Sequence, residues 1–352
     1  MSLRQRGLSL VELMIALAMG LMILGSLTAV FVTSTKVRQE NDRFAEQIEN
    51  GRIAVDLMSQ DLRTTGFWDA LDVTQLNPPA SLPDPCTTSS DLATLKSAVT
   101  MYIQGYDNDS GSLSCISDVR SGTDVVVVRR AGTCAVGETG CTGTTAPYIQ
   151  VSKCTPPATR SDGSSGTVTA GTERASTNSA DWYGVETTTG ALTLHKIDCG
   201  NTTLAGAPNY AAIRPYMVHI YYVSNNTEGS DGVPALKMAS LGPGGFTSTT
   251  VATGIEQLQL EYGIDADSNG TPDSYTTAPG TVANWRNVVA VKLHILSRNT
   301  SPSPQFTDTR TYTLGNKADG TANNFGPYGD NIRRHAYSTL VILSNPAGLK
   351  GS

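Results

Sequence analysis

The most regular pattern of hydrophobic and polar positions lies near the N-terminus. From Leu13 to Val32 the chain carries no charged side chain, and a short basic leader that ends at Gly7 precedes this region. Roughly 20 consecutive apolar residues are enough for a helix to cross a bilayer. The pattern therefore predicts a helix that spans a membrane over about residues 10–32.

The helical pattern then continues into a polar region, because the first proline of the chain is Pro78. Apolar residues recur in this region with the 3.6-residue period of one helix face, at Phe44, Ile48, Val55, Met58 and Leu62. Gly66 predicts the end of the helix, since glycine is favoured just past a helix C-terminus. We expect one helix over residues 8–66, on the order of 87 Å long. Its amphipathic half, 33–66, should pack on the rest of the chain, because the stripe is short for the alternative, a coiled-coil dimer.

Beyond the helix, residues 67–352 predict a β-rich head of one large domain or two fused lobes. Short apolar runs bounded by turn-forming residues predict antiparallel strands at Asp124–Arg130, Ala191–Ile197, Met217–Val223, Ala235–Ser240, Ile255–Ile264, Val288–Ser297, Thr309–Leu314 and Ala336–Leu343. In one of them, Leu258, Leu260 and Tyr262 alternate with Gln and Glu, which predicts that one face is exposed to water. The fold class is therefore α+β, with a long helix laid across an antiparallel sheet.

Two regions of the head have a different composition. Residues 67–122 contain several prolines and predict irregular structure, with a brief helix or strand near Leu92–Gln104. Residues 131–181 consist mostly of Gly, Thr, Ser and Ala and predict a long loop region outside the core. Together with the cysteines that follow, they form a Cys- and Gly/Thr-rich insertion over about residues 131–200.

The cysteines all lie beyond the apolar helix, at Cys86, Cys115, Cys134, Cys141, Cys154 and Cys199. An even number confined to one part of the chain predicts disulfides in an oxidising compartment. Local pairing would join Cys86 to Cys115 and leave the other four to pair among themselves. Zinc is the alternative, but the chain has no C-x-x-C motif and no histidine pair nearby.

The charge of the chain argues against nucleic acid as a partner. The formal net charge is −6, and no basic patch is visible beyond the isolated pairs Arg129–Arg130 and Arg333–Arg334. Phosphate binding depends on clustered basic side chains. Removal of the leader with Arg4 and Arg6 would make the net charge −8.

Glu12 is the only ionisable group within the apolar helix. A carboxylate inside a membrane costs about 2.5–3.5 kcal/mol on insertion scales, which favours a functional role. Two alternatives do not explain the segment. A secretory signal should end in a small-x-small cleavage site, and the segment has no convincing site of this kind. An ordinary membrane anchor needs neither the basic leader nor Glu12. The Arg4, Arg6, Gly7 leader with Glu12 five residues later resembles the assembly signal of type IV pilins.

This resemblance implies a processing and assembly chemistry. A prepilin peptidase would cut between Gly7 and Leu8, and the new amine on Leu8 would be methylated. Leu8 departs from the phenylalanine that family members often carry at that position. Glu12 would then pair with the N-terminal amine of a neighbouring subunit inside the membrane, where opposite charges attract strongly.

Three C-terminal segments narrow the resemblance: Gly254–Asp273, Asn287–Arg298 and Arg333–Asn345. In these segments a strand that ends in Tyr-Gly precedes an Asp-rich loop, and a basic pair precedes the final strand. This pattern resembles that of the minor pilin family called PilW. This implies a type IV pilin-like fold and a subunit that helps to initiate pilus assembly at or near the fibre tip. The implied partners are other minor pilins, the major pilin, the inner-membrane assembly platform and a tip adhesin. The head would lie in the bacterial periplasm before assembly and at the cell surface afterwards.

The Asp-rich loop has the ligand spacing of a calcium site. Oxygen-bearing side chains occupy positions 1, 3, 5, 7 and 9 of an EF-hand-like pattern, at Asp265, Asp267, Asn269, Thr271 and Asp273, with Gly270 at position 6. Thr276 stands at position 12, where a glutamate would supply two ligands. The alternative is a solvated hairpin tip, in which Asp, Asn and Gly supply turn geometry. Calcium is the one cofactor that the sequence raises.

Other functions have less support in the sequence. No G-x-S-x-G, H-E-x-x-H or P-loop pattern occurs, and the four histidines lie mostly in expected strands, so we expect no enzymatic activity. Three alternatives to a pilus minor pilin stay open: a type II secretion minor pseudopilin, a pilin-anchored adhesin that binds through residues 131–181, and a membrane-tethered hydrolase.

Overall fold

The computed structural model describes residues 9–108, 113–141, 145–154, 178–196 and 210–351. The leader 1–7, the expected cleavage site at Gly7 and Leu8, and Cys199 lie outside the described residues.

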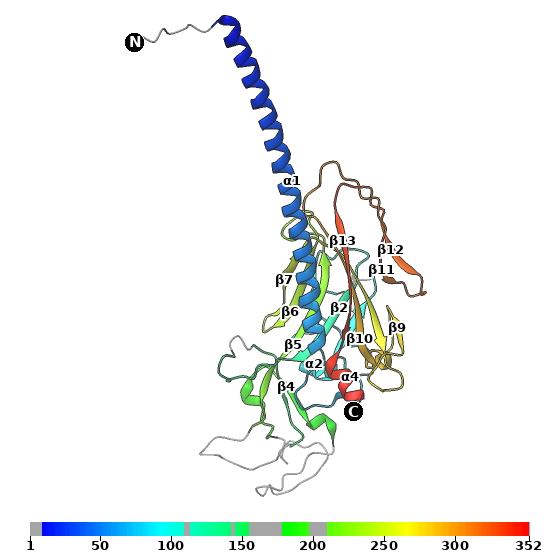
Figure 1. Cartoon of the computed structure of the whole chain (residues 1–352). Helices are drawn as coiled ribbons and strands as arrows, with labels where there is room; N and C mark the ends of the chain where they lie inside the picture. The colour runs from blue at the N-terminus through cyan, green and yellow to red at the C-terminus, as the bar shows by residue number, and fades with distance from the viewer. Residues whose placement is uncertain (1–8, 109–112, 142–144, 155–177, 197–209, 352) are drawn as a thin grey trace.

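One helix, α1, runs from Leu10 to Thr64, and its first half stands clear of the head (Figure 1). By length and composition it could cross a membrane, and none of its most apolar stretch is buried. Ser9 caps the N-terminus, because its hydroxyl accepts from the amide of Val11 at 3.4 Å. At the other end, Gly66 has a φ of 71°, the left-handed conformation that glycine adopts just past a helix C-terminus.

The described part of the head contains three antiparallel sheets. The largest has seven strands: β1 (Ile103–Tyr106), β2 (Val125–Ala131), β3 (Tyr148–Val151), β4 (Tyr183–Glu186), β5 (Ile213–Ser224), β6 (Ala235–Gly242) and β7 (Gly245–Thr253). The second has the order β13-β10-β8-β9, with β8 (Ile255–Ile264), β9 (Ser274–Thr276), β10 (Val288–Arg298) and β13 (Arg334–Ile342). The third is the pair β11 (Tyr312–Asn316) and β12 (Ala322–Phe325). The α+β fold class is therefore confirmed.

The remaining helices are short and lie outside these sheets. They are α2 (Leu92–Ser97), α3 (Val282–Trp285) and α4 (Ser344–Lys350), with 3-10 turns η1 (Val73–Gln75), η2 (Ala98–Thr100), η4 (Ser179–Asp181) and η5 (Thr189–Ala191). Two disulfides join described cysteines that follow one another in the chain, Cys86 to Cys115 and Cys134 to Cys141. Cys154 is buried and is not a free cysteine.

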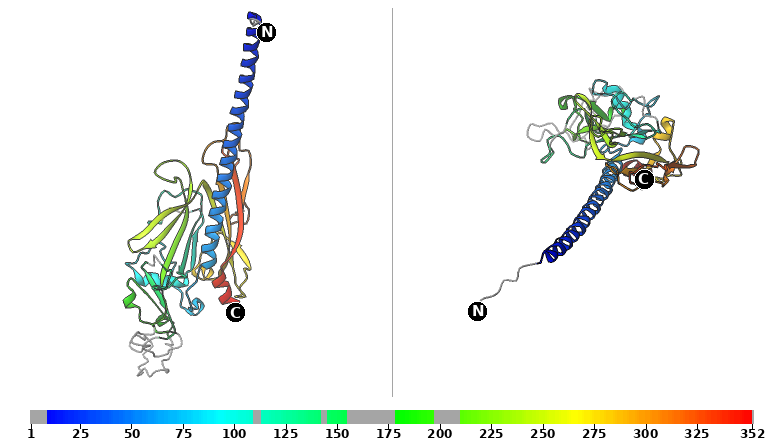
Figure 2. Two further views of the ribbon diagram at one scale, coloured as in Figure 1. Left: turned by 60° about the vertical axis from the view of Figure 1, so that its left-hand side comes forward. Right: turned by 90° about the horizontal axis from the view of Figure 1, so that it is seen from above.

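The second half of α1 lies along the seam between the two larger sheets (Figure 2). It contacts β13, β10 and β8 of one sheet and β7 and β2 of the other. Ala54, Met58 and Leu62 of α1 are fully buried in a core that both sheets share. One hydrophobic core therefore holds the helix and the sheets together as a single head.

The buried face of α1 differs from the expected one near the point where the helix leaves the head. Phe44 and Ile48, predicted to be core residues, are 48% and 37% exposed, whereas Gln47 and Gly51 are buried. The reason is a close approach of β13, because the Tyr337 ring lies where a side chain on Gly51 would stand. The small residue, rather than the large apolar ones, therefore faces the sheet.

The expected wet face of β8 is also buried. Gln257, Gln259 and Glu261 are 8%, 4% and 4% exposed, so this prediction is wrong. Residues 299–333, which we call the arm, fold back with β11 and β12 over that face (Figure 1). In the arm, Asn323 donates to Gln259 at 2.9 Å, and the amide of Asn316 donates to Glu261 at 2.9 Å.

The strands predicted from Met217 onwards overlap β5, β6, β8, β10, β11 and β13, with ends that differ by up to four residues. The prediction of a strand over Ala191–Ile197 is wrong, since that region has η5 and a single bridge from His195 to Tyr210. Strand β3 lies within the region predicted as loop, and its Ile149 and Gln150 are buried. Gln150 holds this strand in place, because its side chain bonds the backbone of Leu194 and Ala211. The partners of Gln150 are distant in the sequence, so the local sequence could not predict that this strand would be held in the sheet.

Candidate assembly and metal sites

Glu12 lies in the first turn of α1, where a negative charge is favoured by the helix dipole. Its carboxylate accepts from the amide of Ser9 at 3.0 Å, and this bond completes a capping box with the Ser9 hydroxyl. The large apolar residues around it, from Leu10 to Leu17, are all at least half exposed. The carboxylate of Glu12, the only acidic group in this stretch, therefore points back toward the residues that precede the helix. The apolar surface around it is not covered by the described chain.

A set of contacts ties α1 to the arm where the helix leaves the head. Gln47 donates to the carbonyl oxygens of Ser297 and Arg333, both at 3.1 Å. Glu40 accepts from the hydroxyl of Ser303 at 2.8 Å, and Arg43 donates to the carbonyl of Pro302 at 3.0 Å. The direction in which α1 leaves the head is therefore set partly by the arm.

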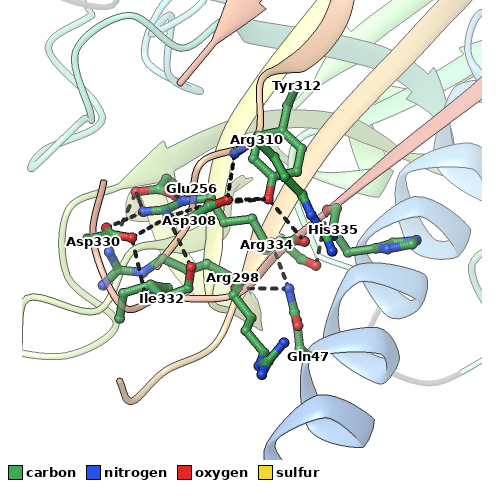
Figure 3. A network of polar contacts seen from close by, with 12 residues as sticks. Gln47, Glu256, Arg298, Asp308, Arg310, Tyr312, Asp330, Ile332, Arg334 and His335 are labelled. Carbon is green, nitrogen blue, oxygen red and sulfur yellow. Dashed lines mark hydrogen bonds and ion pairs between the residues drawn. The ribbon is translucent and has the colours of Figure 1, made fainter. Parts of the chain in front are cut away.

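The arm in turn is held by a buried charge network around Arg334, the first residue of β13 (Figure 3). Its guanidinium bonds Glu256 of β8 and two carboxylates of the arm, Asp308 at 3.0 Å and Asp330 at 2.7 Å. Arg298 lies 3.5 Å from Glu256, and Tyr312 donates to Asp308 at 3.1 Å. One arginine thus connects the second sheet with both ends of the arm.

Electrostatics explain why this charge can be buried. Burial disfavours a charged guanidinium, but the hydrogen bonds and charges of Asp330, Glu256 and Asp308 raise the pKa of Arg334 above its ordinary value. The sequence showed the pair Arg333–Arg334, but the three carboxylates come from distant positions. Arg333 instead stays partly exposed, 3.7 Å from Glu40. The two arginines therefore serve the structure: Arg334 binds the buried carboxylates, and Arg333 lies beside α1.

A second buried cluster lies at the other end of α1, around Asp61. Its carboxylate bonds Arg130 of β2 at 2.8 Å and Tyr221 of β5 at 2.9 Å, and lies 2.6 Å from Nδ1 of His219. Burial alone would raise the pKa of Asp61, but His219 and Arg130 lower it to about 2. An ionised carboxylate only accepts hydrogen bonds, so the histidine nitrogen donates. Asp61 therefore pins the end of α1 to the larger sheet.

The Asp-rich loop joins β8 to β9 as a hairpin, which is the alternative that the sequence left open. Carboxylate oxygens of Asp265, Asp267 and Asp273 lie within 4.8 Å of one another. Asp265 accepts from the amides of Asn269 and Gly270 at 3.1 and 3.0 Å, so it also shapes the turn. Thr276 at position 12 pairs with Tyr262 in the β8–β9 ladder, outside the loop. The loop thus brings three oxygen ligands together without a twelfth-position carboxylate.

Two family models match the chain. Residues 220–345 match the model of the type IV pilus-assembly protein W, PilW, and residues 2–28 match the prokaryotic N-terminal methylation motif. The first range contains the Asp-rich loop, the arm and the Arg334 network, and the second contains Gly7, Leu8 and Glu12. No curated protein and no solved structure matches the chain.

Proposed function

Because the chain is a type IV pilus minor pilin of the PilW family, as its two family matches show, we propose that it helps to initiate pilus assembly. In this proposal it sits at or near the fibre tip, in a complex with other minor pilins and a tip adhesin, and the major pilin follows. It acts as a structural subunit and as a substrate of the prepilin peptidase, rather than as an enzyme.

The observation that carries this proposal is the placement of Glu12. The carboxylate lies in the first helical turn and reaches back to Ser9, next to the residue that would carry the new amine after a cut between Gly7 and Leu8. Nothing in the described head neutralises it, and a carboxylate in lipid needs a partner. The amine of a neighbouring subunit supplies one, and that pairing would recruit the next pilin from the inner membrane and its assembly platform.

Replacement of Glu12 tests the proposal. We expect Glu12→Ala to leave membrane insertion intact while the number of pili per cell, counted by electron microscopy, falls at least tenfold, since removing one partner of a buried ion pair typically costs about 3–5 kcal/mol. Glu46→Ala removes an exposed carboxylate from the same helix and should leave pilus number unchanged. Wild-type pilus numbers in the Glu12→Ala strain would refute the proposed role.

Processing is tested separately by intact-mass measurement of the chain recovered from the membrane. We expect loss of residues 1–7, with a methyl group on Leu8. A retained leader, or a cut at another bond, would contradict the proposed processing.

A binding function is favoured by one specific observation. Strand β4, which belongs to the Gly/Thr-rich insertion, lies at the end of the head opposite the N-terminus of α1 (Figure 1). We propose that residues 131–181 contact surfaces once the pilus is assembled. Deletion of residues 155–177 keeps β3 and β4 and should abolish adhesion while sparing pilus number. Loss of pili in this deletion would assign the insertion to assembly instead.

We also propose Ca²⁺ as the ligand of the Asp-rich loop. Three carboxylates within 4.8 Å repel one another, and a hard cation with oxygen ligands would relieve that repulsion. Calcium should raise the melting temperature of the full chain in detergent, and Asp267→Asn should remove the increase. Asp319→Asn, in an exposed turn of the arm, serves as the control. An equal increase in all three proteins, or none in the wild type, would overturn this proposal.

A further inference from the structure

A cavity of about 400 Å³ lies where η1, helix α3 with the residues that follow it, the Asp-rich loop and helix α4 meet. Its walls include Val73, Tyr102, Pro346 and Leu349, which are largely apolar, and two cationic residues, Arg286 and Lys350. This volume falls in the range of small-molecule sites, which are typically apolar with a few polar groups. Helix α4, which supplies part of its lining, lies near the C-terminus, at the end of the head away from the N-terminus (Figure 1).

The two cations are held by neutral oxygen atoms. Nη2 of Arg286 donates to the carbonyls of Val73 at 3.1 Å and Leu76 at 3.1 Å. Tyr102 fixes the backbone of Arg286, because its hydroxyl donates to the Arg286 carbonyl at 2.7 Å. Nζ of Lys350 donates to the side-chain oxygen of Asn287 and lies 3.5 Å from the carbonyl of Asp265. Within the described chain, neither cation forms an ion pair with a carboxylate.

Two carboxylates of neighbouring segments, Asp265 and Asp72, make their hydrogen bonds elsewhere. Asp265 is fully buried, and its two oxygens accept the amides of Asn269 and Gly270. Asp72 uses both of its oxygens within η1, on Thr74 and Gln75. Two like charges therefore line the same cavity.

We propose that this cavity binds the carboxylate group of a small ligand, between Arg286 and Lys350, with the rest of the ligand against its apolar walls. Arg286 uses Nη2 for the protein carbonyls, while its Nε and Nη1 make no hydrogen bond to the described residues, so they can donate to an anion. Charge-assisted hydrogen bonds of this kind are the strong ones. The carboxylate could belong to an acidic sugar or to the end of a peptide chain, and the same chemistry would recognise both. This inference does not depend on the role of Glu12 in assembly.

Calorimetric titration of the full chain in detergent tests the proposal with matched ligand pairs. One pair is glucuronate and glucose, which differ in the carboxylate; the other is a short peptide with a free or an amidated C-terminus. Saturable binding of the charged member of either pair alone supports the site and identifies the source of the carboxylate. Equal binding of the charged and neutral members, or no binding of any ligand, would overturn it.

A variant then locates the binding. Lys350→Gln should weaken binding about tenfold, because a charge-assisted hydrogen bond is lost. Lys317→Gln removes an exposed lysine from the turn between β11 and β12 and should leave affinity within about twofold. Melting temperatures of both variants show whether the fold is retained. Unchanged affinity in Lys350→Gln, or an equal loss in both variants, would refute the assignment.

Discussion

At the scale of single residues, two positions on α1 decide how the helix meets the head. Asp61 brings a charge into the core, where Arg130, His219 and Tyr221 surround its carboxylate. Gly51 brings no side chain at all, so the ring of Tyr337 can lie against the helix backbone. The Tyr337 hydroxyl donates to the carbonyl of Ile48 at 3.1 Å. The packing of α1 on the head therefore depends on the charge of the side chain at Asp61 and on the absence of a side chain at Gly51.

Asp61 predicts a pH dependence of stability. Its pKa is lowered from 3.8 to about 2 in the fold, so its stabilising effect is complete above about pH 4 and is lost as the pH falls toward 2. Asp61→Asn should reduce the free energy of unfolding by about 2 kcal/mol at neutral pH, and the difference should shrink below about pH 4. Urea unfolding across pH measures this. Asp56→Asn, an exposed neighbour, should change little, and a pH-independent difference for Asp61→Asn would contradict the interpretation.

Gly51 predicts a steric effect that opposes helix propensity. Alanine in an exposed helix is favoured over glycine by about 1 kcal/mol. Here the added methyl group would clash with the Tyr337 ring, and overpacking typically costs about 1–3 kcal/mol. We expect Gly51→Ala to lower the melting temperature of the head, whereas Gly25→Ala, with open space around it, should not. A more stable Gly51→Ala protein would show that Tyr337 moves aside freely.

At the scale of elements, the arm closes the polar face of the second sheet. Asn316 and Asn323 bond the buried side chains of β8, and the Arg334 network anchors the arm through Asp308 and Asp330. Because the arm also contacts Glu40 and Arg43 of α1, it connects the sheet with the part of the helix that leaves the head. The arm is therefore a structural link between the head and the membrane half of α1.

Loss of Arg334 should release the arm. Arg334→Gln would leave buried carboxylates without their counter-charge, a change that typically costs about 3–5 kcal/mol. We expect faster amide hydrogen exchange across residues 299–333 and a lower free energy of unfolding. Arg333→Gln changes the partly exposed neighbour and should have a small effect. Equal effects of the two substitutions would argue against the network as the anchor of the arm.

At the scale of the whole molecule, the head buries one face of α1 and leaves apolar side chains exposed on the others. Phe44, Ile48, Ile53 and Leu57 are all at least 37% exposed, with Phe44 and Ile48 one turn apart on the same side of the helix. Exposed apolar patches mark interaction sites. In an assembling pilin, the pair Phe44 and Ile48 is suited to contact the helices of neighbouring subunits.

This arrangement predicts opposite effects for residues that share one sequence pattern. The double variant Phe44→Ser/Ile48→Ser should keep the melting temperature of the chain but reduce its amount in sheared pili, because it changes a contact surface. Met58→Ser should instead destabilise the head by about 2–5 kcal/mol, since Met58 is fully buried. A marked loss of stability in the double variant would place Phe44 and Ile48 in the core after all.

The sequence by itself determined the features that depend on neighbouring residues. The apolar run and the glycine after Thr65 define α1, and period-two patterns define β8 and β10, because helix and strand periodicity are local properties. Cys86 and Cys115 are also close enough in the chain for local pairing to be expected.

Only the tertiary structure decided which surfaces are covered. The alternation in β8 predicted a wet face, but the arm, some 50 or more residues later, buries it. The period of α1 marked Phe44 as core, yet the close approach of Tyr337 turned Gly51 inward instead. The sequence could not predict the ion pairs of Arg334 with Glu256 and Asp308. These residues are far apart in the chain, and their attraction becomes strong only when the fold removes all three from water.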